Sequence, residues 1–247
     1  MTSTGWSFPV PHTAGILYPG FSAEDDYPTL QHLLGEDVRL PLVHTLMRED
    51  AHRVDALLDV GSEQVLAEGA RALGPVDSVI WACTSGSFVF GWDGAREQVD
   101  KLRAVTGVPT SSTSFAFVHA AAHLGVSRVA VAATYPAEVA ARFVEFLHAA
   151  GLDVVGMAAR GIVTAAEVGT LGREAVLEFA AAHDHPEAEA LLLPDTALHT
   201  AAWLEDLHAR VGKPVLTANQ VSAWEALRLA GDDRPRHGLG ALFAAGR

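Results

Sequence analysis

A cysteine stands in a turn of small polar residues, directly after a short apolar run. The run covers residues 78–82, and Cys83 is followed by Thr84, Ser85, a glycine and a further serine. Small residues let backbone N–H groups approach a ligand closely, and N–H groups at a helix start attract anions. The same field favours thiolate over thiol and lowers the pKa of a cysteine. We therefore expect a reactive Cys83 beside a carboxylate-binding pair, Thr84 and Ser85; the alternative is a buried structural cysteine.

A carboxylate occupies a similar place later in the chain. Asp195 follows the apolar run 190–193, and Thr196 comes directly after it. An aspartate in this position can act as a general acid or base, or can set the charge of its neighbours. Thr196 adds a hydroxyl or backbone donor for a substrate carboxylate. The alternative for Asp195 is an ordinary helix N-cap.

Three further turns carry polar side chains that could reach the same pocket. Tyr135 follows the apolar run 128–133, and its hydroxyl could bind a carboxylate. Ser22 lies in the turn after the first predicted strand. Asn219 and Gln220 end the last predicted strand, where packing or capping explains them equally well. Tyr135 and Ser22 are therefore expected among the substrate-binding residues.

Most of the 12 histidines are expected on solvated helix faces. His119, His123 and His199 lie near the polar turns and could carry protons, but an isolated helix histidine is more often merely solvated. No histidine is assigned to the site.

Short β-branched runs alternate with longer amphipathic stretches. This alternation predicts an α/β protein with parallel sheet and helices on both faces. The amphipathic stretches, whose apolar residues recur at three and four, include 50–73, 137–150 and 198–211. The predicted strands are Gly15–Pro19, Val38–Leu42, Ser78–Ala82, Val108–Ser111, Arg128–Ala133, Asp153–Met157, Ala190–Leu193 and Pro214–Ala218.

Residues 77–125 and 189–231 resemble each other. In each, a buried strand ends in a polar turn, a helix follows, and Gly-x-Pro introduces a second strand before an alanine-rich helix. This similarity indicates an internal duplication in which Cys83 and Asp195 hold matching places; the alternative is the general likeness of all αβ units. We expect two pseudo-symmetric αβα lobes, residues 1–112 with 221–247 and residues 113–220. Ligands of parallel sheets bind at the carboxyl ends of the strands, so the active site is expected in the cleft between the lobes.

Composition excludes several classes of partner. The formal net charge of −13 repels nucleic acid and anionic membranes. No apolar run is long enough to cross a bilayer, and the first twelve residues lack the features of a secretory signal. One cysteine cannot form an internal disulfide, which fits a cytoplasmic protein. The sequence also lacks zinc-ligand spacing, a Walker pattern and a GxGxxG opening, so neither a metal nor another cofactor is expected.

The stretches GILYPG, CTSGSF, ATYPAE, LLLPDTALHT and GKPVLTANQVSAWEALRLAG occur in this order over nearly the whole chain. Together they resemble the maleate isomerase and arylmalonate decarboxylase branch of the aspartate/glutamate racemase superfamily. The resemblance implies two αβα lobes related by pseudo-twofold symmetry and chemistry without a cofactor at the carbon next to a carboxylate. It implies a small carboxylate as substrate, and a homo-oligomer is compatible with it.

Racemases and maleate isomerases of this superfamily use two cysteines, one from each lobe. By resemblance, Cys83 matches the first cysteine, Thr84 and Ser85 match a carboxylate-binding Thr-Ser pair, and Tyr135 matches a tyrosine that binds the same carboxylate. Arylmalonate decarboxylases have glycine at the first cysteine position and use the second cysteine as proton donor.

Two positions depart from the family pattern. Asp195 stands where the second cysteine should be, which argues against two-thiol racemisation and against the usual decarboxylase arrangement. Ser22 stands near where maleate isomerases have an asparagine.

The sequence therefore favours a cofactor-independent isomerase like maleate cis-trans isomerase, with Cys83 as nucleophile and a small unsaturated or dicarboxylic acid as substrate. Two alternatives remain. One is a decarboxylase of substituted malonates in which Cys83 gives a proton to an enediolate. The other is a carboxylate-binding protein without turnover.

Overall fold

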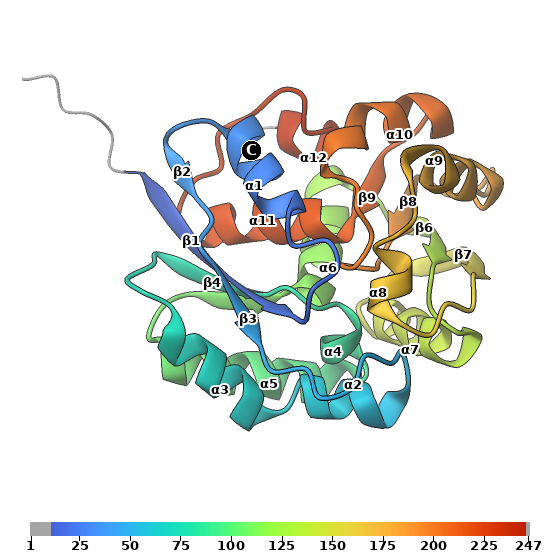
Figure 1. Cartoon of the computed structure of the whole chain (residues 1–247). Coiled ribbons are helices and arrows are strands. Elements are labelled where there is room, and N and C mark those ends of the chain that lie inside the picture. The colour runs from blue at the N-terminus through green and yellow to red at the C-terminus, as the bar shows by residue number, and fades with distance from the viewer. Residues whose placement is uncertain (1–10, 246–247) are drawn as a thin grey trace, which may run out of the picture.

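The strands form two parallel sheets, one in each half of the molecule (Figure 1). The computed structural model describes residues 11–245, so the first ten residues of the N-terminal segment considered for a signal lie outside the described residues. The first sheet has the order β2-β1-β4-β5, with β3 also paired to β1. Its strands are β1 (His12–Pro19), β2 (Val38–Arg39), β3 (Leu42–Thr45), β4 (Ser78–Trp81) and β5 (Thr110–Ser112).

The second sheet repeats the arrangement of the first. Its order is β7-β6-β8-β9, so that β8 holds the place that β4 holds in the first sheet. Its strands are β6 (Arg128–Ala133), β7 (Asp153–Ala159), β8 (Ala190–Leu193) and β9 (Val215–Thr217). The chain therefore has the α/β fold with two parallel-sheet lobes that was predicted.

Helices cover the faces of both sheets. In the first half these are α1 (Asp26–Leu34), α2 (Val54–Val60), α3 (Glu63–Ala72), α4 (Ser85–Phe88) and α5 (Gly91–Thr106). The remainder are α6 (Thr113–Leu124), α7 (Ala137–Ala149), α8 (Ala165–Val168), α9 (Arg173–Ala182), the 3-10 turn η1 (Ala201–Trp203), α10 (Leu204–Val211), α11 (Ala218–Leu229) and α12 (Ala241–Ala244). None of the helices within residues 11–245 is both long and apolar enough to span a bilayer.

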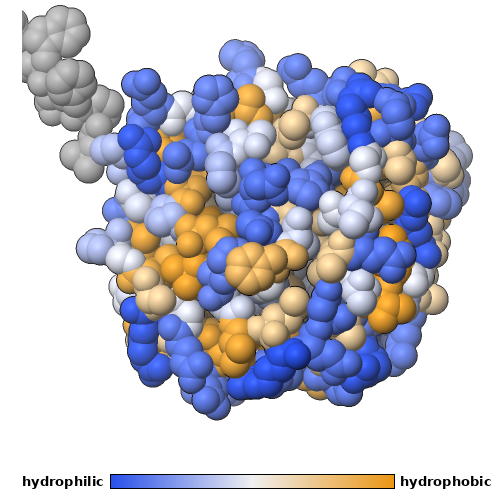
Figure 2. All heavy atoms as spheres, viewed as in Figure 1, coloured by the Kyte–Doolittle hydropathy of each residue, from blue (hydrophilic) through white to orange (hydrophobic). Residues whose placement is uncertain are grey.

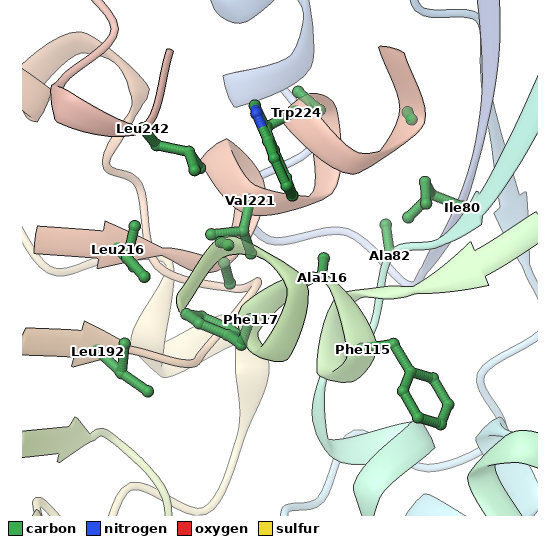
Figure 3. Packing of buried hydrophobic residues seen from close by; sticks show 14 of the residues in the cluster. Ile80, Ala82, Phe115, Ala116, Phe117, Leu192, Leu216, Val221, Trp224 and Leu242 are labelled. Carbon is green, nitrogen blue, oxygen red and sulfur yellow. The ribbon is translucent and has the colours of Figure 1, made fainter. Parts of the chain in front are cut away.

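Helices α6 and α11 pack against each other and join the two halves (Figure 1). Figure 3 shows Phe117 of α6 and Val221 of α11 on the side of Leu192, with Ile80 of β4 across the same cluster. One apolar core thus extends from the first sheet to the second, which fixes the lobes relative to each other. Helix α11 also contacts β1, β4 and β5. We propose residues 1–112 with 221–247 and residues 113–220 as the two lobes, a division supported by the strand membership of the sheets and by these α11 contacts.

The face viewed in Figure 2 is largely hydrophilic, with apolar residues gathered over the region of β1 and β3. Two large apolar side chains that follow these strands are exposed, Phe21 after β1 and Leu46 after β3. The Phe21 ring stacks on His44, with centroids 4.1 Å apart. The loops after β1 and β3 therefore carry apolar side chains at the surface, beside the turn that contains Ser22.

Three predicted elements are interrupted in the structure. The strand predicted at 38–42 is divided into β2 and β3 because Pro41 has no N–H to donate to the ladder. The stretch 50–73 contains two helices that are separated at Gly61, where a Cβ would lie 2.1 Å from the carbonyl oxygen of Gly86. In the stretch 198–211, the helix α10 begins only at Leu204, after η1. The N–H groups of Thr200 and Ala201, which come before α10 in this stretch, donate instead to the carboxylate of Asp26.

Candidate active site

The cavity between the two lobes brings together most of the predicted site residues. Its wall includes Ser22, Cys83, Ser85, Asp195 and Thr196. Apolar side chains form another part of the wall, namely Pro19, Met47, Ala51, Leu57, Val60, Ala165 and Ala197. The cavity measures only about 30 Å³, which is room for one or two water molecules.

The turn that carries Cys83 is held from several sides. The Gly86 N–H donates to Cys83 Sγ over 3.2 Å, and Ser85 Oγ lies 3.8 Å from the same sulfur. The side-chain amide of Gln98 donates to the carbonyls of Gly61 and Gly86 over 2.7 and 2.8 Å. This amide ties the break between α2 and α3 to the Cys83 turn, so the geometry of the turn depends on residues distant in the sequence.

Burial raises the pKa of the Cys83 thiol to about 11, and the nearby charge of Asp195 adds to this effect. The hydrogen bonds from Gly86 and Ser85 lower the pKa, but by less than burial raises it. The prediction of a lowered pKa is therefore wrong for the free protein, because loss of water around the sulfur outweighs the favourable N–H groups. Cys83 rests as a neutral thiol at neutral pH.

Asp195 is fixed by two neutral donors. The Ala197 N–H donates to Asp195 Oδ1 over 2.9 Å, and the Thr134 hydroxyl donates to Oδ2. The first bond closes the turn after β8, and no helix begins there, since η1 starts at Ala201 with Thr200 as its N-cap. The helix N-cap alternative for Asp195 is therefore wrong. The second oxygen is held from the turn after β6. No Lys or Arg is among the described residues that line the cavity.

Thr84 and Tyr135 lie behind the wall of the cavity rather than in it. Both are buried, and the Tyr135 hydroxyl donates to the Pro194 carbonyl over 2.8 Å. Burial raises the pKa of Tyr135 well above its usual value, and the side chains of Thr84 and Ser85 lower it slightly. These three hydroxyl groups are therefore neighbours. Thr84 Oγ1 is buried and makes no hydrogen bond of normal geometry with any described residue, which leaves a donor available beside Cys83.

Ser22 and Thr196 meet through a tyrosine that sequence reasoning did not single out. The Tyr18 hydroxyl donates to the Thr196 carbonyl over 2.9 Å and accepts from the Ala23 N–H over 3.1 Å. Its bond to Ser22 Oγ, at 2.7 Å, must then be donated by the serine. Ser22 presents only lone pairs to the cavity in this state, so it would have to rotate to donate to a carboxylate. Burial also raises the pKa of Tyr18, which keeps this hydroxyl neutral.

Asn219, at the start of α11, and Asp26 of the first lobe hold the Asp195–Thr196 turn. The Asn219 amide donates to the Thr196 carbonyl over 3.1 Å and to Asp26 Oδ2 over 3.0 Å. Gln220 has a different role, since its side chain completes a capping box with Thr217 at the start of α11. Asp26 was not expected at the site; in sequence it is one of several acidic residues before α1, and nothing local indicates its burial.

His52 is a buried side chain at the cavity that the sequence analysis did not single out. Most histidines were expected on solvated helix faces, but His52 lies in the loop before α2 and is only 7% exposed. His52 Nε2 lies 3.9 Å from Asp195 Oδ2, and the imidazole ring meets Tyr135 edge to face with centroids 4.9 Å apart. His119 and His199 instead pair with Glu225 and Asp25, which are not in the cavity wall.

Comparison with known proteins identifies related chains. The model of the arylmalonate decarboxylase family matches residues 54–243. Arylmalonate decarboxylase of Bordetella bronchiseptica is 32% identical over 148 residues, which are 58% of this chain and 60% of that protein. The alignment thus covers less than two thirds of that relative.

Solved structures share the fold over almost the full length. The maleate isomerase of Pseudomonas putida with maleate has a TM-score of 0.85 at 21% identity, covering 95% of this chain and 98% of its own. A crystal structure of arylmalonate decarboxylase has a TM-score of 0.74 at 25% identity, covering 95% and 100%. A Nocardia farcinica maleate cis-trans isomerase variant with a covalently bound succinylcysteine intermediate has a TM-score of 0.81 at 22% identity, covering 96% and 99%. The fold, the cleft and the family match agree, and the chain belongs to the arylmalonate decarboxylase family.

Proposed function

We propose that this protein is a cofactor-independent isomerase of the maleate cis-trans isomerase type, acting on a small unsaturated or dicarboxylic acid with Cys83 as nucleophile. The observation that carries the proposal is that Cys83, Ser85 and Asp195 line one interlobe cavity. A thiol at the first-lobe position, where related decarboxylases have glycine, supports isomerase chemistry. The covalent succinylcysteine intermediate of the Nocardia enzyme supports a cysteine nucleophile.

In this proposal the hydroxyl groups, the thiol and the apolar wall each have a separate role. In the proposed reaction Ser85 and Thr84 offer neutral hydroxyl groups to one substrate carboxylate, and Tyr135 joins them once its hydroxyl turns away from the Pro194 carbonyl. These donors stabilise the charge that builds on the carboxylate as Cys83 adds to the neighbouring double bond. The new C–C single bond can rotate, and loss of the sulfur then gives the trans acid. Apolar residues of the wall, such as Leu57 and Val60, exclude water from the adduct. Because the resting thiol is neutral, a base must take its proton before addition.

Decarboxylation of a substituted malonate is the second candidate, and one observation favours it. The raised pKa of Cys83, about 11, keeps the thiol protonated at neutral pH. A protonated thiol is ready to give its proton to the enediolate that forms when the C–C bond breaks and CO₂ leaves. The thiolate then recovers a proton from water.

Proton NMR distinguishes the candidates in one experiment. Purified protein is incubated with maleate and with a panel of substituted malonates, without metal or nucleotide. Isomerase activity gives the fumarate signal, and decarboxylase activity gives a monoacid. Binding of these acids without turnover would instead favour the carboxylate-binding alternative.

Cys83→Ala is the matched variant for this assay. It should remove turnover while leaving the circular dichroism spectrum and the melting temperature close to those of the wild type, since the change deletes one buried atom. A fully active Cys83→Ala protein would show that the cysteine is structural and would refute both catalytic candidates.

The proposal includes a cytoplasmic location and a small carboxylate as the ligand, with no nucleic acid or membrane partner. The net charge of −13 supports this choice of partners. The oligomeric state can be measured by light scattering.

A further inference from the structure

We propose that His52, whose Nε2 lies beside the carboxylate of Asp195, is the group that carries the proton during turnover at Cys83. The inference rests on the proposed function and adds to it the acid–base residue that the chemistry requires. Addition of sulfur to one alkene carbon leaves the neighbouring carbon in need of a proton, and the chain has one cysteine. The second proton carrier must therefore be another side chain of the same cavity.

His52 is fixed at its backbone and at one ring nitrogen. Its N–H donates to the Val163 carbonyl over 2.6 Å, and its Nδ1 lies 3.1 Å from the Ile162 carbonyl. A carbonyl oxygen only accepts, so Nδ1 must carry the hydrogen. Nε2 is left as the nitrogen that can gain and lose a proton, and it is the nitrogen that faces Asp195.

Thr134 positions both partners of the imidazole. Its hydroxyl donates to Asp195 Oδ2, and its carbonyl accepts from the Ile162 N–H over 2.9 Å. The two groups that His52 touches therefore rest on one residue at the end of β6. This shared support gives the His52 ring a defined orientation toward the cavity.

The charges around His52 leave Asp195 as its main electrostatic partner. Asp50, two residues before His52, accepts from the N–H groups of Ala165 and Ala166 at the start of α8. Glu49 and Asp50 both lie in the cavity wall, and Glu49 pairs with the exposed Arg53. Of the groups on the second lobe that face the imidazole, Tyr135 stays neutral because burial raises its pKa.

Cys83, across the same cavity, is also neutral at rest because burial raises its pKa to about 11. No Lys or Arg is among the described residues of the wall. The imidazolium that forms when His52 takes the thiol proton would therefore be the one cation of the described cavity wall, beside the negative charge that develops on the substrate.

In the proposed isomerisation, His52 accepts and returns every proton that moves. As the S–C bond forms, Nε2 receives the thiol proton and the alkene electron pair moves to the second carbon and its carboxylate. Nε2 then gives that proton to the second carbon, which leaves a saturated thioether. After rotation Nε2 takes the same proton back, the double bond re-forms, the S–C bond breaks and the proton returns to sulfur. Asp195 stabilises the imidazolium at each stage.

Kinetics of matched variants test this assignment. In His52→Gln, a side-chain N–H can still reach the Ile162 carbonyl but no proton can be carried, so kcat should fall about 10²- to 10⁴-fold with KM changed less than about threefold. Asp195→Asn should lower kcat in the same direction and alter the pH–rate profile. His119→Gln is the control, because His119 pairs with Glu225 outside the cavity wall and should not affect kcat.

Chemical rescue by added imidazoles distinguishes a proton-carrying histidine from a structural one. Added imidazoles should restore turnover to His52→Ala, with a rate that depends on the basicity of the imidazole. A His52→Gln protein that keeps wild-type kcat, or a His52→Ala protein that imidazoles do not rescue, would overturn the inference while leaving the isomerase intact.

A substrate-independent measurement keeps this inference distinct from the proposed function. In ¹⁵N NMR of the wild-type protein, the His52 signals, assigned by their loss in His52→Gln, should show the neutral ring with its hydrogen on Nδ1, as the Ile162 carbonyl requires. The reverse tautomer would overturn the assignment. If the wild-type protein turns over none of the acids, the proposed function fails and this spectrum alone decides the state of His52.

Discussion

Cys83 and Asp195 each lie two residues beyond the end of a buried strand, Cys83 after β4 and Asp195 after β8. The two strands hold equivalent places in their sheets, so the lobes present a thiol and a carboxylate to one cavity. This equivalence explains why a chain with one cysteine can still offer two reactive groups, one from each lobe. The physical behaviour of each group depends on what surrounds it, and the following predictions test those surroundings.

The pH dependence of Cys83 alkylation should reveal a buried neutral thiol. Burial raises its pKa from 9.0 to about 11, so the rate of reaction with iodoacetamide should still be rising at pH 10. Mass spectrometry measures the rate without ambiguity because the chain has one cysteine. A rate that levels off below pH 8 would instead indicate a thiolate in the free protein.

The same shift affects stability. A thiol whose pKa is higher in the folded state stabilises the fold fully below its unfolded pKa and loses that contribution as pH rises through the folded value. The window therefore runs from about pH 9 to about pH 11. Urea denaturation of wild-type and Cys83→Ala proteins should show a decline with pH in this window that is weaker in the variant.

Thr84→Val should make the free protein more stable and raise its KM for a carboxylate substrate. Thr84 Oγ1 is buried without a hydrogen bond of normal geometry, and its replacement by a methyl group should raise the free energy of unfolding by about 1 kcal/mol. Loss of the hydroxyl should raise KM for a carboxylate substrate about tenfold or more. Thr110→Val, a similar change on β5 away from the cavity wall, should leave KM unchanged. Equal KM values in wild-type and Thr84→Val proteins would remove Thr84 from the carboxylate site.

Asp26→Asn should loosen the contact between the lobes. The N–H groups of Thr200, Ala201 and Asn219 all donate to the Asp26 carboxylate, and an asparagine would turn its own NH₂ toward at least one of them. The unpaired donors should cost about 2 kcal/mol and lower the melting temperature by roughly 4–8 °C, measured calorimetrically at pH 7.

The neighbouring residue supplies the control for this prediction. Asp25 is exposed and pairs with His199, so Asp25→Asn should change stability by no more than about 0.5 kcal/mol.

Burial raises the pKa of Asp26, so the stability of the wild type should decline as pH rises from the ordinary carboxyl pKa through the raised value. Absence of that decline would show that Asp26 is not buried as described.

Asp50→Ala should loosen the contact between the loop before α2 and the start of α8. Asp50 in the first lobe accepts the N–H groups of Ala165 and Ala166 in the second, next to the bond between His52 and Val163. Its loss should speed hydrogen exchange of these three amide groups about tenfold, with little change elsewhere, because a cap of this kind contributes about 1 kcal/mol. Glu49→Gln should leave their exchange unchanged, because the carboxylate of Glu49 pairs with the exposed Arg53 and not with these amide groups. Unchanged exchange in Asp50→Ala would show that other contacts hold the two segments together.

Local patterns in the sequence determined much of the fold and part of the site. The segments 128–133 and 190–193 are the strands β6 and β8 with the predicted bounds, because a buried strand needs an unbroken apolar segment, which here covers 129–133 and 190–193. Polar turns after β4 and β8 placed Cys83 and Asp195 at one cleft, because parallel strands all end at the same edge.

Tertiary structure alone decided the remainder. His52 lies within an amphipathic stretch, and only the packing of its loop against Ile162 and Asp195 makes it a buried partner of the carboxylate. The pKa of Cys83 likewise could not be obtained from its neighbours in sequence, which predict a lowered value, because desolvation depends on every chain segment that removes water from the sulfur. Periodicity is a property of a few consecutive residues, whereas burial and contacts between lobes exist only once distant segments have come together.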